Sequence, residues 1–215
     1  MMRTWLLPIA LSLASAALAA PPQHVEITYE LARNDLVLAD VSYRLEHDGR
    51  TYDLTETTKG RGFLSLRGEI VRYSQGTIAA DGLRPRTYED RRTGRDTQRV
   101  QFDPAAKTQT LAGQDRLSMF WTFAFAPLTE GKAKLIATDN KGATNFVFQA
   151  AGRERVKTPA GEFDALKIVK VRDGPEDKAT EVWFAVDRQY IPIRLLVIEK
   201  DGTRLDQLAV KISTR

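Results

Sequence analysis

Hydrophobic and polar residues alternate with a period of two along most of the chain. Val25, Ile27 and Tyr29 share one parity, and alternate residues from Val37 to Leu45 form a second series. This alternation is typical of strands with one buried face. Further strand-like runs cover residues 97–102, 134–138, 145–150, 166–171 and 181–184. Short strands at this spacing predict a mainly β fold of about 10–13 strands, either an antiparallel barrel or a strongly curved sheet.

Asp-Gly pairs separate several of these runs and indicate hairpin turns, because they readily adopt the positive φ angles of tight loops. They begin at Asp48, Asp81, Asp173 and Asp201. If the first pair forms a two-residue loop, Tyr43 lies opposite Leu54. The same loop at the last pair places Leu195 opposite Leu208. Both registers align apolar side chains, as cross-strand pairing favours.

One segment has helical rather than strand periodicity. Apolar residues recur at helical spacing from Leu117 to Ala124, Asp115 is a suitable N-cap, and Pro127 ends the segment. We therefore expect one short helix, from Asp115 to about Phe125, packed against the mouth or the concave face of the sheet.

The N-terminus resembles a secretory signal peptide. Arg3 precedes an apolar stretch over residues 5–18, which ends in the small-x-small pattern Ala17-Leu18-Ala19. That stretch is shorter than the roughly 20 residues of a membrane-spanning helix. We expect residues 1–19 to be a signal peptide cleaved near Ala19, and residues 20–215 to form a single β-rich domain without a transmembrane segment. A chain without cysteine favours a bacterial periplasm.

The sequence offers no pattern typical of a catalytic or metal site. His24 and His47 have no second histidine or cysteine at ligand spacing, and no Gly-x-Ser-x-Gly or phosphate loop occurs. Carboxylates brought together by the fold remain an alternative, since a glycosidase needs only two. We predict a protein that is not an enzyme, with no catalytic residues, metal or cofactor.

Two groups of residues are candidates for binding. Aromatic residues crowd the helical segment and a late strand, so Phe120, Trp121 and Trp183 could line an apolar cavity, although plain core packing is the favoured explanation. Arginines crowd residues 84–99, where Arg91 and Arg92 could contact an anionic partner, although acidic neighbours could simply pair with them. Export and a net charge of only +4 argue against nucleic acid.

Several segments together resemble the DUF3108 family of exported bacterial proteins. They are Ser74-Gln75-Gly76, Asp81-Gly82-Leu83-Arg84-Pro85-Arg86-Thr87-Tyr88, Val100-Gln101-Phe102-Asp103, Asp115-Arg116-Leu117-Ser118, Thr158-Pro159-Ala160-Gly161-Glu162-Phe163 with Leu166-Lys167, Trp183-Phe184, and Ile191-Pro192-Ile193-Arg194. Their order spans nearly the whole chain after the signal peptide. The resemblance implies a β-rich periplasmic fold and supplies no catalytic residues.

The sequence therefore predicts a periplasmic, non-enzymatic binding or envelope-associated protein, with an apolar or lipid-like ligand held inside a curved sheet. Two alternatives stay open besides it. One is a lipid or lipoprotein carrier of the half-barrel type, and the other is an enzyme acting on cell-wall glycan. The sequence also leaves open the oligomeric state and whether the barrel closes.

Overall fold

The computed structural model describes residues 20–102, 113–139 and 141–215. The strands in the first part are β1 (His24–Arg33), β2 (Leu36–His47), β3 (Thr51–Gly60), β4 (Glu69–Ala79), β5 (Gly82–Arg92) and β6 (Gln98–Gln101). Those that follow are β7 (Gly113–Asp115), β8 (Lys132–Asp139), β9 (Gly142–Thr158), β10 (Gly161–Lys170), β11 (Ala179–Ala185), β12 (Ile191–Ile198) and β13 (Arg204–Thr214). The helical elements are α1 (Ser118–Phe125) and the 3-10 helices η1 (Gly62–Arg67) and η2 (Val186–Arg188).

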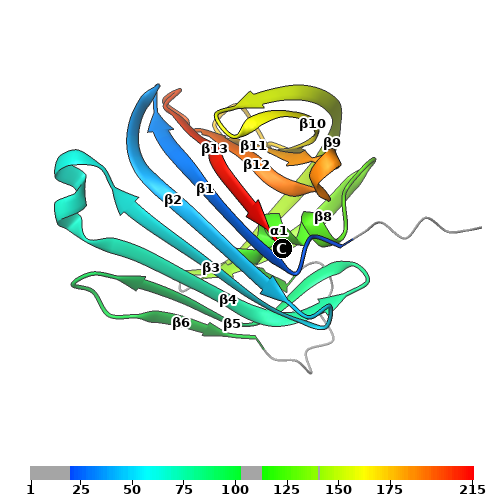
Figure 1. Cartoon of the computed structure of the whole chain (residues 1–215), viewed down its shortest axis with the longest axis horizontal. Coiled ribbons are helices and arrows are strands. Elements are labelled where there is room, and N and C mark those ends of the chain that lie inside the picture. Colours follow the sequence, from blue (N-terminus) through cyan, green and yellow to red (C-terminus); the bar gives the residue numbers. More distant parts are fainter. Residues whose placement is uncertain (1–19, 103–112, 140) are drawn as a thin grey trace, which may run out of the picture.

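The 13 described strands form one sheet in the order β6-β5-β4-β3-β2-β1-β13-β12-β11-β10-β9-β8-β7 (Figure 1). Its centre is the pairing of β1 with β13, which brings the two ends of the domain together. The predicted strongly curved, mainly β sheet is confirmed. One pair departs from the antiparallel pattern, because β7 and β8 run parallel. Since α1 lies between these two strands, the chain crosses over before it pairs again, as parallel neighbours require.

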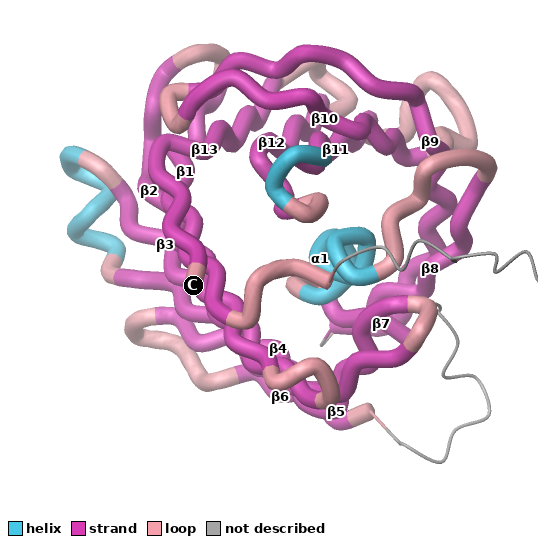
Figure 2. The backbone as a smooth tube through the Cα atoms, turned by 45° about the vertical axis from the view of Figure 1, so that its right-hand side comes forward, coloured by secondary structure: helices cyan, strands magenta, loops and turns pink. Residues whose placement is uncertain are grey.

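The sheet wraps around α1 like a barrel, but its backbone ladder stays open (Figure 2). In the described part of the chain, no backbone pairing joins β7 to β5 or β6. Side chains join these edges instead. Gln114 Nε2 donates to the Leu83 carbonyl at 2.8 Å, and Ser74 Oγ donates to Asp115 Oδ2 at 2.5 Å. We call this side-chain contact between β7 and strands β4 and β5 the seam.

The predicted register of the first hairpin was wrong by two residues. Tyr43 lies opposite Glu56, and Leu45 lies opposite Leu54. The cause is a longer loop, in which Asp48 Oδ1 accepts the backbone N–H of Thr51 at 2.7 Å. A shift of two residues keeps each side chain on its expected face, so the apolar faces still coincide.

The register of the last hairpin was wrong by one residue, which has a larger effect. Leu195 lies opposite Gln207, and Arg194 lies opposite Leu208. Gly202 has a φ of +79°, and Glu199 pairs with Thr203 across a three-residue loop. A shift of one residue moves every side chain of the partner strand to the other face of the sheet.

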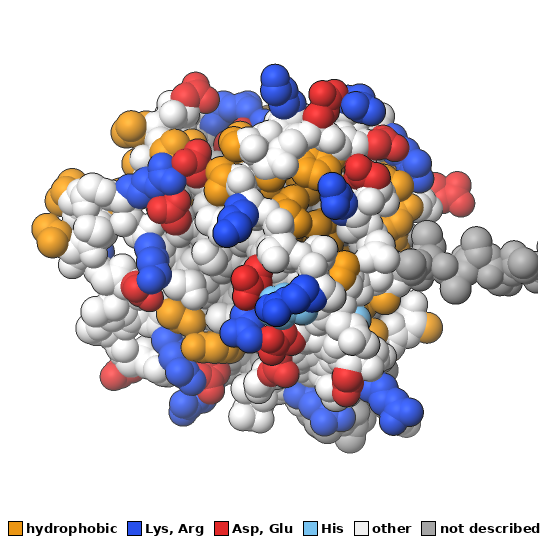
Figure 3. Space-filling model, in the orientation of Figure 1, with side chains coloured by type: hydrophobic (Ala, Val, Ile, Leu, Met, Phe, Trp, Pro, Cys, Tyr) orange, Lys and Arg blue, Asp and Glu red, His pale blue; other side chains and the backbone are white. Residues whose placement is uncertain are grey.

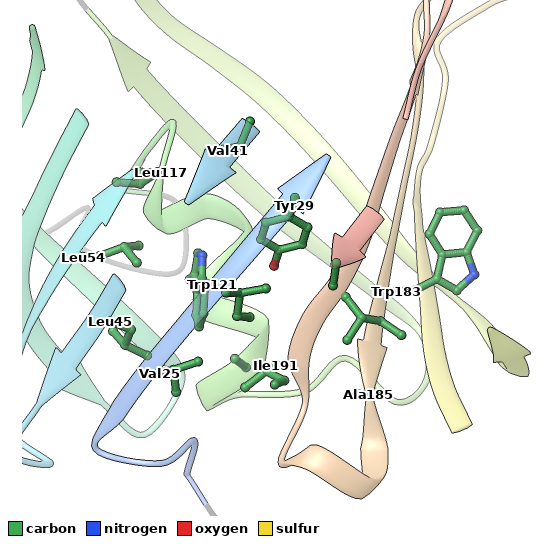
Figure 4. Packing of buried hydrophobic residues seen from close by; sticks show 14 of the residues in the cluster. Val25, Tyr29, Val41, Leu45, Leu54, Leu117, Trp121, Trp183, Ala185 and Ile191 are labelled. Atoms are coloured by element: carbon green, nitrogen blue, oxygen red, sulfur yellow. The ribbon is translucent and has the colours of Figure 1, made fainter. Parts of the chain in front are cut away.

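Helix α1 is confirmed as the helix packed against the sheet, and it is buried on two sides. Trp121 packs into one cluster with Leu45, Leu54 and Ile191, as Figure 4 shows. Phe123 packs into a second cluster with other aromatic and aliphatic side chains, among them Phe148 and Phe184. An eight-residue helix that is apolar nearly all round is stable here because both of its sides are covered.

No helix in the described ranges is long and apolar enough to cross a membrane. The predicted signal peptide, residues 1–19, lies outside the described residues.

Candidate functional site

Phe120 and Trp121 are consecutive residues of α1, so they point to different sides of the helix, and Phe120 is half-buried whereas Trp121 is buried. They line an apolar cavity together with Tyr29 and Tyr43, and its volume is about 20 Å³. Such a space holds about one water molecule. The side chain of Trp121 is only 2% exposed. Core packing therefore accounts for these two rings in this conformation.

Trp183 lies apart from them. Its neighbour Val182 lines the same small cavity, so strand alternation turns Trp183 to the other face of β11. Figure 4 shows its ring pointing away from Trp121. There its indole N–H donates to Glu154 Oε1 at 2.5 Å, and Lys167 Nζ and the Arg194 guanidinium lie 4.8 and 4.6 Å from the ring centroid. Phe120 and Trp121 thus both line the small cavity, whereas Trp183 is buried in the same hydrophobic cluster as Trp121 but does not line the cavity and forms cation–π contacts with Lys167 and Arg194.

Asp115 fixes the position of α1 at the seam. Its Oδ1 accepts the backbone N–H groups of Leu117 and Ser118, both at 2.7 Å, so it holds the turn that leads into the helix, whose N-cap residue is Leu117. Its Oδ2 accepts the Ser74 hydroxyl, which is also 2.9 Å from Tyr52 Oη. Burial raises the pKa of Asp115 to about 6, although the hydrogen bonds from Ser74, Ser118 and Leu117 act to lower it. The helix starts at Ser118, three residues later than predicted, so Asp115 is not its N-cap residue; Asp115 instead ends β7 and links the turn before the helix to β4.

A polar cleft opens where β4, β5 and β8 approach one another near the seam. Its volume is about 270 Å³, close to the lower end of the roughly 300–1,000 Å³ typical of small-molecule sites. Five basic side chains line it: Arg72, Arg92, Arg95, Arg116 and Lys141. Three acidic side chains line it as well: Asp90, Asp96 and Asp139. We call this region the seam cleft.

A chain of ion pairs builds the inner wall of the seam cleft. Arg72 donates to buried Glu56 and, at 3.3 Å, to Asp90. Arg92 binds the same Asp90 through Nε and Nη2 at 3.0 and 2.9 Å. Burial acts to raise the pKa of Asp90, but the hydrogen bond from Arg92 and the charge of Arg72 outweigh it and hold that pKa below its usual value. The wall is therefore ionised at neutral pH.

The outer wall comes from the other side of the seam. Arg116 Nε donates to Asp139 Oδ2 at 2.7 Å. Burial acts to raise the pKa of Asp139, and the hydrogen bonds from Arg116 and the Lys141 backbone N–H lower it below its usual value. Arg72, Arg92 and Arg116 thus all have carboxylate partners within the described residues.

The structure separates the two arginines that the sequence grouped as an anion contact. Arg92 faces the seam cleft with Asp90, whereas Arg91 faces the other side of β5. There Arg91 binds Glu89 at 2.6 Å and lies 4.7 Å from the Tyr73 ring centroid. This separation could have been predicted from the sequence, because successive side chains of a strand point to opposite faces of the sheet. Nothing local in the sequence placed Arg116 and Lys141 beside them.

Metal ligands do not cluster in the described part of the chain, where no group of three or more His, Cys, Asp or Glu side chains could hold an ion.

Solved structures that resemble this fold share little sequence with it. A beta-barrel-like protein of the DUF1849 domain of unknown function from Brucella abortus is 11% identical, with a TM-score of 0.47 over 92% of this chain and 100% of that one. A candidate exported protein with a YmcC-like fold from Bacteroides fragilis is 12% identical, with a TM-score of 0.42 over 91% of this chain and 100% of that one. No curated protein has significant sequence similarity to this chain.

A protein-family model matches most of this chain. Residues 26–208 match the family described as protein of unknown function, DUF3108; the match extends from β1 to the first part of β13 and includes both walls of the seam cleft. The chain belongs to the DUF3108 family.

Proposed function

We propose that this protein is an exported, non-enzymatic component of the cell envelope that binds an anionic group, a phosphate or a carboxylate, in the seam cleft. The composition of that cleft carries the proposal, because five basic side chains face three acidic ones. Arg72, Arg92 and Arg116 use their charges in ion pairs, whereas the side chains of Arg95 and Lys141 form no ion pair among the described residues, and the Lys141 side chain acts on Asp139 only through its nearby charge. Their positive charge is therefore available to a ligand, and guanidinium and ammonium groups bind such anions well.

Export is supported by the N-terminal segment. Its basic residue, apolar stretch and small-x-small ending are typical of a secretory signal. A periplasmic location agrees with a chain that contains no cysteine.

A binding role rather than catalysis is supported by the carboxylates. A glycosidase needs one carboxyl group with a raised pKa as its general acid. In the seam cleft the pKa values of Asp90 and Asp139 are lowered instead. Asp115 has a raised pKa, but it is fully buried, and its oxygens accept hydrogen bonds from the Leu117 and Ser118 N–H groups and from the Ser74 hydroxyl. A glycan-acting enzyme is therefore the weaker alternative.

Calorimetric titration with sn-glycerol 3-phosphate tests the proposal, with uncharged glycerol as the control ligand. We expect the phosphate to bind and glycerol not to bind. The double substitution Arg95→Ala and Lys141→Ala should weaken the phosphate affinity by about tenfold or more, since each hydrogen bond to a charged group contributes about 1.5–3 kcal/mol. Arg91→Ala is the matched control, because Arg91 lies on β5 and faces the other side of the sheet. Equal affinity in the double variant and the wild type would contradict the proposal.

An apolar or lipid-like ligand inside the sheet remains a second proposal, and a lipid carrier is its extended form. The observation that favours it is the contact of the half-buried Phe120 with the small apolar cavity beneath α1. Because that cavity is only about 20 Å³, the helix would have to move outward to admit a ligand. Native mass spectrometry of protein purified from its own host tests it, and a ligand-free mass would count against it.

A further inference from the structure

The 3-10 helix η1 presents large apolar side chains to solvent at one end of the molecule. Phe63 is 75% exposed and Leu66 is 85% exposed. Leu36 is 67% exposed and begins the neighbouring strand β2, whose Leu38 carbonyl accepts the Arg61 N–H at 2.7 Å. Figure 3 shows hydrophobic side chains protruding at the left end, where η1 lies in Figure 1. Water contact with this much apolar surface is unfavourable, so the feature calls for a binding partner.

The geometry of η1 places Phe63 and Leu66 on one side. Residues three apart eclipse each other in a 3-10 helix, so these two side chains form a ridge. Leu64 and Arg67, also three apart, turn toward the body of the protein and line a groove beside β4. The helix therefore turns its fully apolar pair outward, while the half-buried Leu64 and the exposed Arg67 lie beside the groove.

The base of η1 is held firmly, so the ridge cannot fold back onto the sheet. Arg61 donates to Asp40 Oδ1 at 2.6 Å and to Glu30 at 2.8 Å. A Cβ at Gly60 would lie 2.5 Å from the Leu64 carbonyl oxygen, and one at Gly68 would collide with the Thr93 side chain. These close approaches fix both ends of the turn against their neighbours.

Two arginines beside the ridge carry positive charge. Lys59 pairs with Glu69 at 2.8 Å and Arg92 pairs with Asp90 at 2.9 Å, whereas Arg67 and Arg95, which line the groove beside η1, form no ion pair among the described residues. An apolar ridge flanked by arginine is the pattern of a protein that lies on an anionic bilayer, with the apolar side chains among the lipid tails and the cations at the headgroups.

We propose that the Phe63–Leu66 ridge docks into the surface of a bilayer that contains anionic lipid. A convex ridge suits a bilayer, whose interface deforms around inserted side chains, better than it suits a helical or extended peptide, which needs a concave groove. The inference stands on the exposed ridge and its basic surroundings, and it does not depend on a ligand in the seam cleft.

Flotation of the purified protein with vesicles tests this docking. One set contains phosphatidylcholine alone, and the other contains phosphatidylcholine with phosphatidylglycerol. We expect the wild type to bind the mixed vesicles more tightly. The substitutions Phe63→Ser and Leu66→Ser together should reduce the partition coefficient by about tenfold or more. Both side chains are exposed, so the double variant should keep the wild-type circular dichroism and melting temperature.

A charge pair completes the test. Arg67→Gln should weaken binding to the mixed vesicles, whereas Arg153→Gln should not, because Arg153 is half-exposed on the distant strand β9. Neither change touches Arg95 or Lys141, so the result is independent of the phosphate titration. Wild-type protein that binds neither vesicle would overturn the proposal, as would a serine variant that binds like the wild type. Self-association through the ridge would appear as a wild-type dimer in sedimentation without vesicle binding, and would also overturn it.

Discussion

Asp115 is a single side chain that holds together three parts of the molecule. It ends β7, accepts the backbone N–H groups of Leu117 and Ser118 where α1 begins, and accepts the Ser74 hydroxyl from β4 across the seam. Burial disfavours its charged form, which is why its pKa lies at about 6 instead of the 3.8 of an exposed aspartate. The protein thus tolerates a destabilising buried charge at neutral pH, and the same carboxylate anchors the helix.

The pH dependence of stability should reveal this charge. Because the folded-state pKa is the higher one, the contribution of Asp115 to the free energy of unfolding is largest below about pH 4 and falls by about 3 kcal/mol as the pH rises past about 6. Asp115→Asn keeps the accepting oxygen and removes the charge. Relative to the wild type, we expect this variant to gain about that much stability between pH 4 and pH 7 in urea unfolding.

Asp90→Asn serves as the control of opposite sign. The pKa of Asp90 is lowered by its arginine partners, so its stabilising contribution is present at neutral pH and is lost as the pH falls through its folded-state pKa. The Asp90 variant should therefore lose stability relative to the wild type as the pH rises. A stability difference for Asp115→Asn that stays constant with pH would show that the buried carboxyl does not titrate in this range.

Helix α1 is the element that fills the interior, and its fit depends on close contact with the start of β5. Thr122 Oγ1 accepts the Leu83 N–H at 3.0 Å. A Cβ at Gly82 would collide with that same hydroxyl oxygen. The helix can approach the strand only because this position has no side chain.

Gly82→Ala should therefore displace the helix. Gly142→Ala is a matched control, because Gly142 has nearly the same φ, +120° against +118°, and a Cβ there would have no other atom within 4 Å. Both variants carry the strain of a positive φ. We expect the Gly82 variant to be less stable than the Gly142 variant by about 1–3 kcal/mol, the usual cost of overpacking, in thermal or urea unfolding. Equal destabilisation of the two variants would contradict this prediction, because it would mean that α1 moves away from Gly82 without any loss of stability.

Taken as a whole, the protein is an open sheet closed by side chains. Backbone hydrogen bonds connect every pair of neighbouring strands from β6 through the central β1 and β13 to β7. Only side-chain contacts such as that of Gln114 with the Leu83 carbonyl connect the two ends in the described residues. Protection of backbone amides from hydrogen exchange should therefore be greatest where β1 pairs with β13 and least at the seam.

Hydrogen exchange measures this difference directly. We expect amides of β1 and β13 to exchange slowest and those of the short edge strands β6 and β7 to exchange fastest. Gln114→Ala removes one seam hydrogen bond, so it should speed exchange in β7 and the start of α1 while leaving β1 and β13 unchanged at pH 7. Uniformly faster exchange across the sheet would indicate that the seam contributes to global stability.

Features that depend on neighbouring residues could be predicted from the sequence alone. The alternation of Val25, Ile27 and Tyr29 marks a strand with one buried face, and those side chains are buried. The helix was predicted for the same reason, since its period is set within a few residues, but its start was placed three residues too early because Asp115 holds the turn before the helix rather than its N-cap. The DUF3108 membership was also readable from the order of short motifs.

Features that depend on distant contacts emerged only in the folded chain. The register of the last hairpin differs by one residue from the predicted one because its loop contains three residues rather than two. The pattern of apolar residues along the two strands is compatible with both registers. The positions of Phe120, Trp121 and Trp183 in the sequence do not determine which of them share a cavity. In the structure Trp183 lies on the face of β11 opposite to Val182, which lines the small cavity. The seam cleft joins Arg92 to Arg116 and Lys141 only because the curved sheet brings its two ends together, and no local signal encodes that meeting.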